Sequence, residues 1–380
     1  MAIRKTDAKE EASRHLDTHE REAITSQVLR NCSISDSRHA GLYSICGLAL
    51  RLRDLFKWEK GLDPWIEREA SEILAWIGEK EETWEELVEK DFVDLMILDE
   101  PYEPFETKSI NEILEPHDLF YGAGYVHSLK PTFFLAILEE KKTLNGHPVY
   151  TLGRELARDL FTVPALSQDN CIVLRRESAK LILWDQIFHI RKSGRQALSF
   201  ALAEHGLNLR DQEALHRNLA KIFESEIDTY IYHELGEIED TIFDRKIFRE
   251  IIATFPHTPI EHLARAIKDL LADTKENGTL PYIIHERRKA SLGFYVAFLE
   301  GMKRELFPEL VETFPKFTRT GDWPIISEVV SMGNNRARHY AETIIDIHQR
   351  GKEEKDEAWA EQEIWRHLLS PMGIANQKVG

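Results

Sequence analysis

The segment between Lys221 and Arg245 carries the side chains best suited to chemistry in this chain. It holds eight Asp or Glu residues and one His, and it contains no Lys or Arg. If the segment is helical, alternating spacings of four and three residues place six polar side chains on one face. They are Glu226, Tyr230, His233, Glu237, Asp240 and Asp244. Carboxylates beside an imidazole are the groups of a metal site or of an acid–base site.

A metal-dependent enzyme is the first functional hypothesis. Carboxylate oxygens with one imidazole nitrogen suit Fe(II), Mn(II) or Zn(II) better than a Cys-rich structural zinc site. His233 and Glu237 are one helical turn apart, and a later helix presents a second His and Glu with similar spacing. The predicted metal ligands are Glu226, His233, Glu237, His339 and Glu342. Glu237 or Asp240 is the predicted catalytic proton acceptor.

Familiar metal motifs match this face only in part. The run from His233 to Glu237 has Glu where a zincin helix has its second His, which disfavours a metalloprotease. A ferritin-like di-iron bundle needs two Glu-x-x-His motifs on separate helices. The run from Glu213 to His216 supplies one of them. The motifs therefore leave the reaction and the substrate open.

Two other interpretations of the acidic face remain open. Apolar residues such as Ile231 and Leu235 lie roughly opposite it, so the acids can simply face water. Alternatively they join an ionic network between helices, with Arg287, Arg288 and Lys289 as expected partners. The alternative to an enzyme is a non-catalytic interaction or scaffold protein, whose acidic faces and tryptophan-rich helices dock a partner.

The hydrophobic pattern predicts a mainly α protein of the α+β kind, with a small and largely antiparallel β-sheet inserted in the middle of the chain. The predicted regions are a charged arm at 1–33, a helical region at 34–91, the β-containing insert at 92–175, a second helical region at 176–369 and a tail at 370–380. Within the insert, Asn145-Gly146 predicts a hairpin that returns the chain from Thr132 through Val149.

Individual helices follow from apolar spacing and capping residues. Ser35 or Asp36 is expected to cap a helix that ends near Gly61. Further predicted helices are 63–77, 82–90, 153–161, 211–243 and 282–306. The acidic face is thus expected on one long helix.

Composition limits the location and the partners of the protein. A net charge of −17 and a pI near 5.5 argue against binding to nucleic acid or to an anionic membrane. The apolar runs are far shorter than the roughly 20 residues needed to cross a bilayer, and the first residues lack the apolar region of a signal peptide. Three cysteines without a CxxC spacing fit a reducing compartment. We expect a cytoplasmic protein whose partner is a small molecule or another protein.

Several sequence motifs together resemble an uncharacterised bacterial family that carries a domain of unknown function. The motifs are ISDSRHAGLYSICGLALRLRDLFKWEKGLDPW, YGAGY, KPTFFLA, LGRELARDL, YHELGE, KDLLADT and SLGFYVAFLEG. The resemblance runs from about residue 30 to residue 345. It implies a bacterial, cytoplasmic protein, and it implies no activity, substrate or cofactor.

Overall fold

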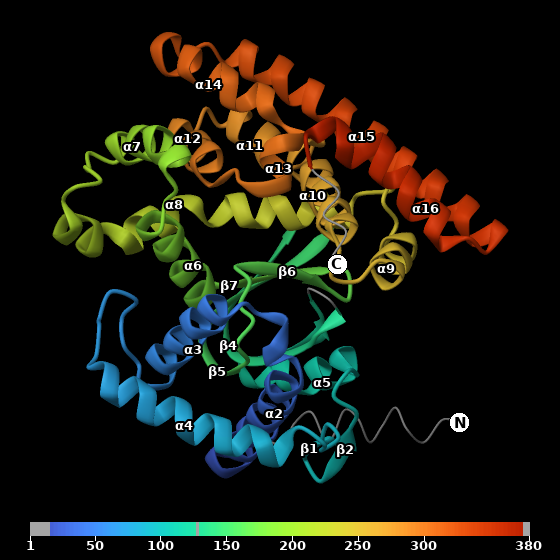
Figure 1. Ribbon diagram of the computed structural model, residues 1–380. Helices are drawn as coiled ribbons and strands as arrows, with labels where there is room; N and C mark the ends of the chain where they lie inside the picture. Colours follow the sequence, from blue (N-terminus) through green and yellow to red (C-terminus); the bar gives the residue numbers. More distant parts are fainter. Residues whose placement is uncertain (1–15, 127–128, 375–380) are drawn as a thin grey trace. The chain divides into compact units, whose positions relative to one another are not determined.

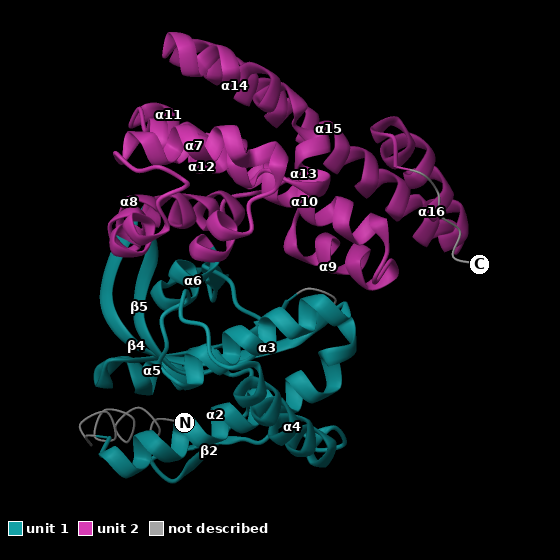
Figure 2. Ribbon diagram, turned by 60° about the vertical axis from the view of Figure 1, so that its left-hand side comes forward, with its two compact units in different colours: residues 1–182 teal, residues 183–380 magenta. Residues whose placement is uncertain are grey.

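The computed structural model describes residues 16–126 and 129–374. The chain divides into two units, residues 1–182 and residues 183–380 (Figure 2). Helices dominate, and one mostly antiparallel five-stranded sheet lies between residues 119 and 175, which confirms the predicted fold class. Residues 1–15 of the predicted arm and 375–380 of the predicted tail lie outside the described residues, and the finer predicted division of the chain stays a prediction.

The five-stranded sheet of unit 1 has the order β3-β4-β5-β7-β6 (Figure 1). Its strands are β3 (Leu119–Tyr125), β4 (Pro131–Leu144), β5 (His147–Arg158), β6 (Ala165–Gln168) and β7 (Cys171–Arg175). Only the β5–β7 pair is parallel. Asn145 and Gly146 both have positive φ and form the turn between β4 and β5, which confirms the predicted hairpin. Register shifts between Leu135 and Glu140 indicate bulges, which bend a strand.

The helix predicted at 153–161 is wrong, because β5 continues to Arg158. Its charged residues resemble a solvent-facing helical stripe, but three of them, Glu155, Arg158 and Asp159, are buried in unit 1. Glu155 is 2% exposed and accepts from the Arg175 Nε at 3.0 Å, and Arg158 is 3% exposed. Their mutual compensation makes a charged strand possible inside the unit.

Helices and a small hairpin accompany this sheet. They are α2 (Thr18–His39), α3 (Ile45–Glu59), α4 (Ala70–Leu87), α5 (Thr107–Leu114) and α6 (Arg176–Phe188), with β1 (Leu95–Ile97) and β2 (Glu100–Tyr102) as the hairpin. The two helices predicted at 63–77 and 82–90 form one helix, α4, which begins at Ala70, so the predicted helix start at residue 63 is wrong. Ser44 caps α3 by accepting from the Gly47 N–H, so the predicted cap at Ser35 or Asp36 is wrong.

Asp36 instead anchors α2 to the sheet through a buried ionic triad. Its carboxylate lies 3.1 Å from the Lys130 Nζ and accepts from the Leu160 N–H. Lys130 also donates to Asp159 at 3.0 Å, and all three side chains are buried. Burial raises the pKa of Asp36 to about 7. Burial disfavours the Lys130 ammonium, but the two carboxylates outweigh this effect and raise the pKa of Lys130.

The regular elements in the described part of unit 2 are helices. They are α7 (Arg195–Glu204), α8 (Gln212–Ile238), α9 (Arg245–Thr254), α10 (Pro259–Thr274), α11 (Thr279–His285), α12 (Lys289–Phe298), α13 (Gly301–Leu306), α14 (Pro308–Thr320), α15 (Trp323–Glu354) and α16 (Glu357–Ile364), followed by one π-helical turn (Trp365–Leu369). The central helix α10 packs against both α8 and α15. None of the described helices is long and apolar enough to cross a membrane.

A glycine sets the distance between α8 and α10. A Cβ placed on Gly236 would lie 2.2 Å from the Ala272 carbonyl oxygen, so any larger residue would push the two helices apart. This close approach places α8 and α10 side by side (Figure 1).

Two helices predicted in unit 2 have different limits. The helix predicted at 211–243 ends at Ile238, because Asp240 accepts from two N–H groups of the following turn and Asp244 caps α9. The helix predicted at 282–306 is three helices, α11, α12 and α13. Arg287 and Gly301 have positive φ at the two breaks, a conformation that ends a right-handed helix.

We predict that Lys130→Met lowers the free energy of unfolding by about 3–5 kcal/mol, because it leaves two carboxylates buried without their cation. Chemical denaturation followed by circular dichroism measures the change. Lys142→Met, on an exposed part of β4, is the matched control and should have little effect. A loss for Lys130→Met below about 1 kcal/mol, which is typical of a surface pair, would contradict a structural role for the triad.

Candidate functional site

The polar faces of α8 and α10 meet in a cluster of paired charges. His233 and Glu237 come from α8, and Asp269 and Asp273 come from α10. Both pairs are four residues apart, so each pair occupies one face of its helix. The close contact at Gly236 holds these two faces together.

Asp273 fixes the orientation of His233. Its Oδ1 lies 2.7 Å from the His233 Nδ1, and its Oδ2 accepts from the Tyr295 hydroxyl and the Lys303 Nζ, both at 2.8 Å. Asp273 is 2% exposed. The imidazole is therefore held by a buried carboxylate that has three polar partners, and its Nε2 is directed toward Glu237 Oε1 at 3.7 Å.

Two lysines neutralise the other carboxylates of the cluster. Lys268 pairs with Oε2 of Glu237, and the Lys303 Nζ lies 4.0 Å from Oδ2 of Asp269. His233, Glu237 and Asp269 each offer one ligand atom, and these three atoms lie within 4.8 Å of one another. Among the described residues, this is the one group of three or more such side chains that can hold a metal ion.

The pairing changes the acidity of His233, Asp273 and Glu237. Burial lowers the pKa of His233, but Asp273 outweighs burial and raises the pKa to about 10. Burial opposes ionisation of Asp273, yet Lys303 and His233 bring its pKa well below the usual range. Lys268 and His233 likewise lower the pKa of Glu237 against the effect of burial. With its present partners the cluster is an ion network, in which a proton occupies the imidazole nitrogen that a metal would need.

A fourth carboxylate, that of Glu234 on α8, borders the cluster. Glu234 is 8% exposed, and burial together with the charge of Glu237 raises its pKa to about 7. A protonated Glu234 adds no negative charge, which limits the repulsion inside the cluster.

The structure brings together only part of the predicted site. His233 and Glu237 lie in the cluster. Asp240 lies in the turn after α8, and Glu226 is buried elsewhere on α8, where its Oε1 accepts from Ser291. The remaining two, His339 and Glu342, are on exposed positions of α15. The predicted roles of these four residues stay predictions.

Sequence analysis missed Asp269, Asp273 and both lysines. The segment KDLLADT contains Lys268, Asp269 and Asp273, and the spacing of four between the two Asp residues was the available signal. The sequence does not show that α8 and α10 are adjacent, so it could not link these two Asp residues to His233 and Glu237. Among the expected cations, Arg288 donates to Ser291 and Tyr282, and its charge acts on Glu226 outside the cluster.

A cavity of about 650 Å³ opens beside the cluster. Residues of α10 and α13 line it, and Asp269 and Lys303 belong to both its wall and the cluster. The candidate metal group is therefore accessible from one side through Asp269.

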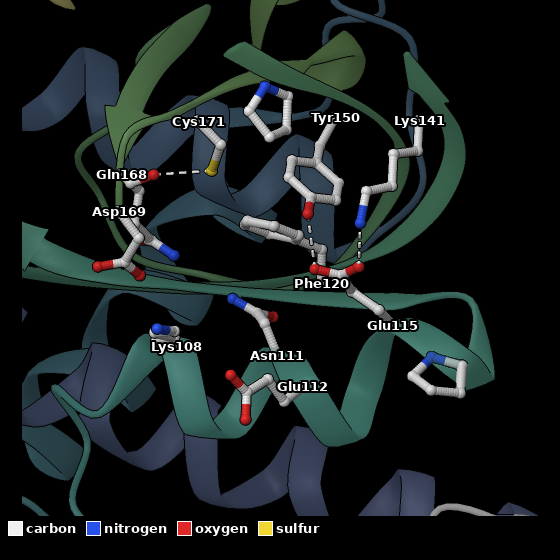
Figure 3. Close-up of a pocket in the computed structure, with 12 residues that line it drawn as sticks. Lys108, Asn111, Glu112, Glu115, Phe120, Lys141, Tyr150, Gln168, Asp169 and Cys171 are labelled. Carbon is white, nitrogen blue, oxygen red and sulfur yellow. Dashed lines mark hydrogen bonds and ion pairs between the residues drawn. The ribbon is translucent and has the colours of Figure 1, made fainter. Parts of the chain in front are cut away.

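A second cavity, of about 660 Å³, lies in unit 1 between α5 and the sheet. Figure 3 shows Lys141, Tyr150 and Glu115 directed toward one another: the Tyr150 hydroxyl and the Lys141 Nζ donate to Glu115 at 2.8 and 2.7 Å. The Cys171 thiol donates to the Gln168 carbonyl oxygen, and burial raises the pKa of Cys171 to about 12. Because this thiol stays protonated, it is a poor nucleophile.

Two family models match the chain almost end to end. The N-terminal domain of DUF6866, a family of unknown function, matches residues 23–175, and the C-terminal domain of the same family matches residues 180–366. The chain belongs to the DUF6866 family. This confirms the resemblance to a family of unknown function, and the gap between the DUF6866 domains adjoins the boundary between the two units. Comparisons with curated proteins and with solved structures gave no significant match.

Glu226 gives a prediction about pH. Burial raises its pKa to about 7, above the value of about 4.3 expected in the unfolded chain. The folded state therefore binds a proton more tightly than the unfolded state, and this carboxyl lowers stability as the pH rises from about 4.5 through about 7.

We predict that Glu226→Gln raises the free energy of unfolding at about pH 8 by roughly 1–3 kcal/mol and has little effect near about pH 5. The amide oxygen can still accept from Ser291. Urea denaturation at both pH values measures the difference, with Glu224→Gln at an exposed position of α8 as the control. A uniform effect at both pH values would contradict the assignment.

Proposed function

We propose that this member of the DUF6866 family is a metal-dependent enzyme whose divalent ion binds His233, Glu237 and Asp269. One observation carries the proposal: each of the three ligands has a charged partner among the described residues. In metal centres such partners orient the ligands and tune their basicity. The pairs are His233 with Asp273, Glu237 with Lys268, and Asp269 with Lys303.

The distance between the first two ligand atoms supports this arrangement. Two ligands that each lie about 2.1 Å from one ion, at angles of about 90–120°, are roughly 3.0–3.6 Å apart. The His233 Nε2 and the Glu237 Oε1 are 3.7 Å apart, and Asp273 holds the opposite ring nitrogen. Small side-chain shifts therefore suffice to bind an ion.

The number of ligands favours a catalytic site over a structural one. Three protein ligands leave a coordination position for water or substrate, whereas structural zinc sites are closed by four. One nitrogen and two carboxylate oxygens suit Fe(II), Mn(II) or Zn(II). Such an ion polarises a substrate oxygen or activates water, and Glu237 or Asp240 remains the proposed proton acceptor.

The first test is direct metal binding. We predict that the tag-free protein binds about one equivalent of Zn(II), Mn(II) or Fe(II), and that His233→Ala loses it, because the nitrogen ligand is removed. Elemental analysis after gel filtration measures the bound ion. His367→Ala is the matched control, since His367 also pairs with a Glu one turn away but on an exposed surface.

The ion network predicts a different result from the metal site. If the cluster serves only as an ion network, the parent protein takes up none of the three metals and His233→Ala loses stability alone. That outcome would end the proposal. Equal metal loss in His367→Ala would also contradict it.

Asp273 provides a separate test of how the ligand is oriented. We predict that Asp273→Asn weakens metal binding by about 10–100-fold, the usual effect of losing a carboxylate that orients a histidine ligand. Competition with a chromophoric chelator measures the affinity. Asp346→Asn, on an exposed part of α15, should leave the affinity unchanged. Unchanged metal affinity in a folded Asp273→Asn protein would show that Asp273 does not orient His233.

A further inference from the structure

We infer that the site acts on a small molecule with an apolar body and one oxyanion group, a carboxylate or a phosphate, that is directed at the metal ion. This inference rests on the proposed function. It comes from the cavity beside Asp269, whose lining combines charged and apolar side chains.

The cavity has the size of a small-molecule site. Its volume of about 650 Å³ falls in the usual range for such pockets, about 300–1,000 Å³. Asp269 and Lys303 form its inner wall, next to the cluster, and Arg265 and His262 extend that wall along α10. One end of a bound molecule therefore lies next to the proposed ion.

Arg265 is held ready to bind an anion. Its Nε and Nη2 donate to Oε1 of Glu261 at 3.0 and 2.9 Å, and Glu261 is fully buried. This anchor fixes the guanidinium while about a quarter of the side chain stays exposed. Its Nη1 donates to none of the described residues, so this nitrogen can donate to an oxyanion.

The charge around the inner wall favours an anion once the ion is bound. A divalent ion takes up the charge of Asp269. Of the other two lining carboxylates, Glu300 pairs with Arg191 at 2.7 Å, and Glu305 is exposed to water, which screens its charge. Lys303 and Arg265 then remain beside the ion. An anionic group is attracted to all three positive charges, whereas an ammonium group is repelled by them.

Apolar side chains also line the cavity, beside the charged residues and Glu305. Pro259 and Ala266 of the α10 side, Met302 of α13 and Ile374 near the end of the described chain supply carbon surface. An apolar body of the ligand gains free energy by covering these side chains. An inorganic ion alone would leave them exposed to water.

Four probes of similar shape test this inference by calorimetry: phenyl phosphate, benzoate, benzyl alcohol and benzylamine. Each is titrated into protein loaded with Zn(II) and into protein stripped by a chelator, and the bound metal is measured in the same samples. We expect phenyl phosphate, benzoate or both to bind at least about tenfold more tightly than the neutral and cationic probes. Removing the metal should weaken that binding at least about tenfold. The preferred anion distinguishes a phosphate from a carboxylate.

Arg265→Met should weaken binding of the preferred anion by about tenfold without changing the bound metal. Arg217→Met is the matched control, because Arg217 also pairs with a Glu one turn earlier but lies on an exposed face of α8. Since Arg265→Met leaves Glu261 buried without its cation, the double variant Glu261→Gln, Arg265→Met is also tested. Melting curves show that the variants compared are folded.

The outcomes separate this inference from the proposed function. Metal-loaded protein that binds benzylamine most tightly, binds none of the probes, or binds the anions equally without metal overturns the inference and leaves the metal site standing. Unchanged anion binding in both Arg265 variants overturns it as well. A parent protein that takes up no metal overturns the proposed function, and the inference with it.

Discussion

The buried charge between α8 and α10 is the constraint on which the account of unit 2 depends. A carboxylate withdrawn from water is stable only beside cations or donors, and Asp273 has three such partners. Those partners come from α8, α12 and α13, so the same bonds that neutralise Asp273 fix how these helices meet α10. The contact at Gly236 is the steric condition for this arrangement. Asp273 and its partners are therefore both the residues that hold these helices together and part of the proposed metal site.

Unit 1 also buries charged side chains beside their counter-charges, but there the cluster has a structural role. Lys130 is surrounded by Asp36 and Asp159 and is 1% exposed, and none of the three lines the cavity beside α5 or the cavity beside α10. That triad anchors a helix to a sheet. The α8–α10 cluster is only partly buried at Asp269, and a cavity reaches it there. Access from solvent, more than charge density, is what favours a functional role for the second cluster.

The sequence predicted features that short-range chemistry determines. The Asn145-Gly146 turn was predicted because only a few residues adopt its positive φ angles readily. The pairing of His233 with Glu237 followed from helical spacing alone. The prediction failed where contacts between residues distant in the chain determine the structure. Glu155 and Arg158 lie in a strand because Arg175 compensates Glu155. Asp273 became relevant only through the packing of α10 on α8. Such partners are far apart in the chain, and periodicity carries no information about them.

X-ray absorption spectroscopy of the metal-loaded protein tests the central claim most directly. The account predicts one imidazole nitrogen together with carboxylate or water oxygens around a single ion, and a spectrum that loses the imidazole contribution in His233→Ala. No sulfur ligand should be present, because the candidate group contains no cysteine. A first shell of oxygen atoms alone, unchanged by His233→Ala, would contradict the claim that α8 and α10 form a metal centre.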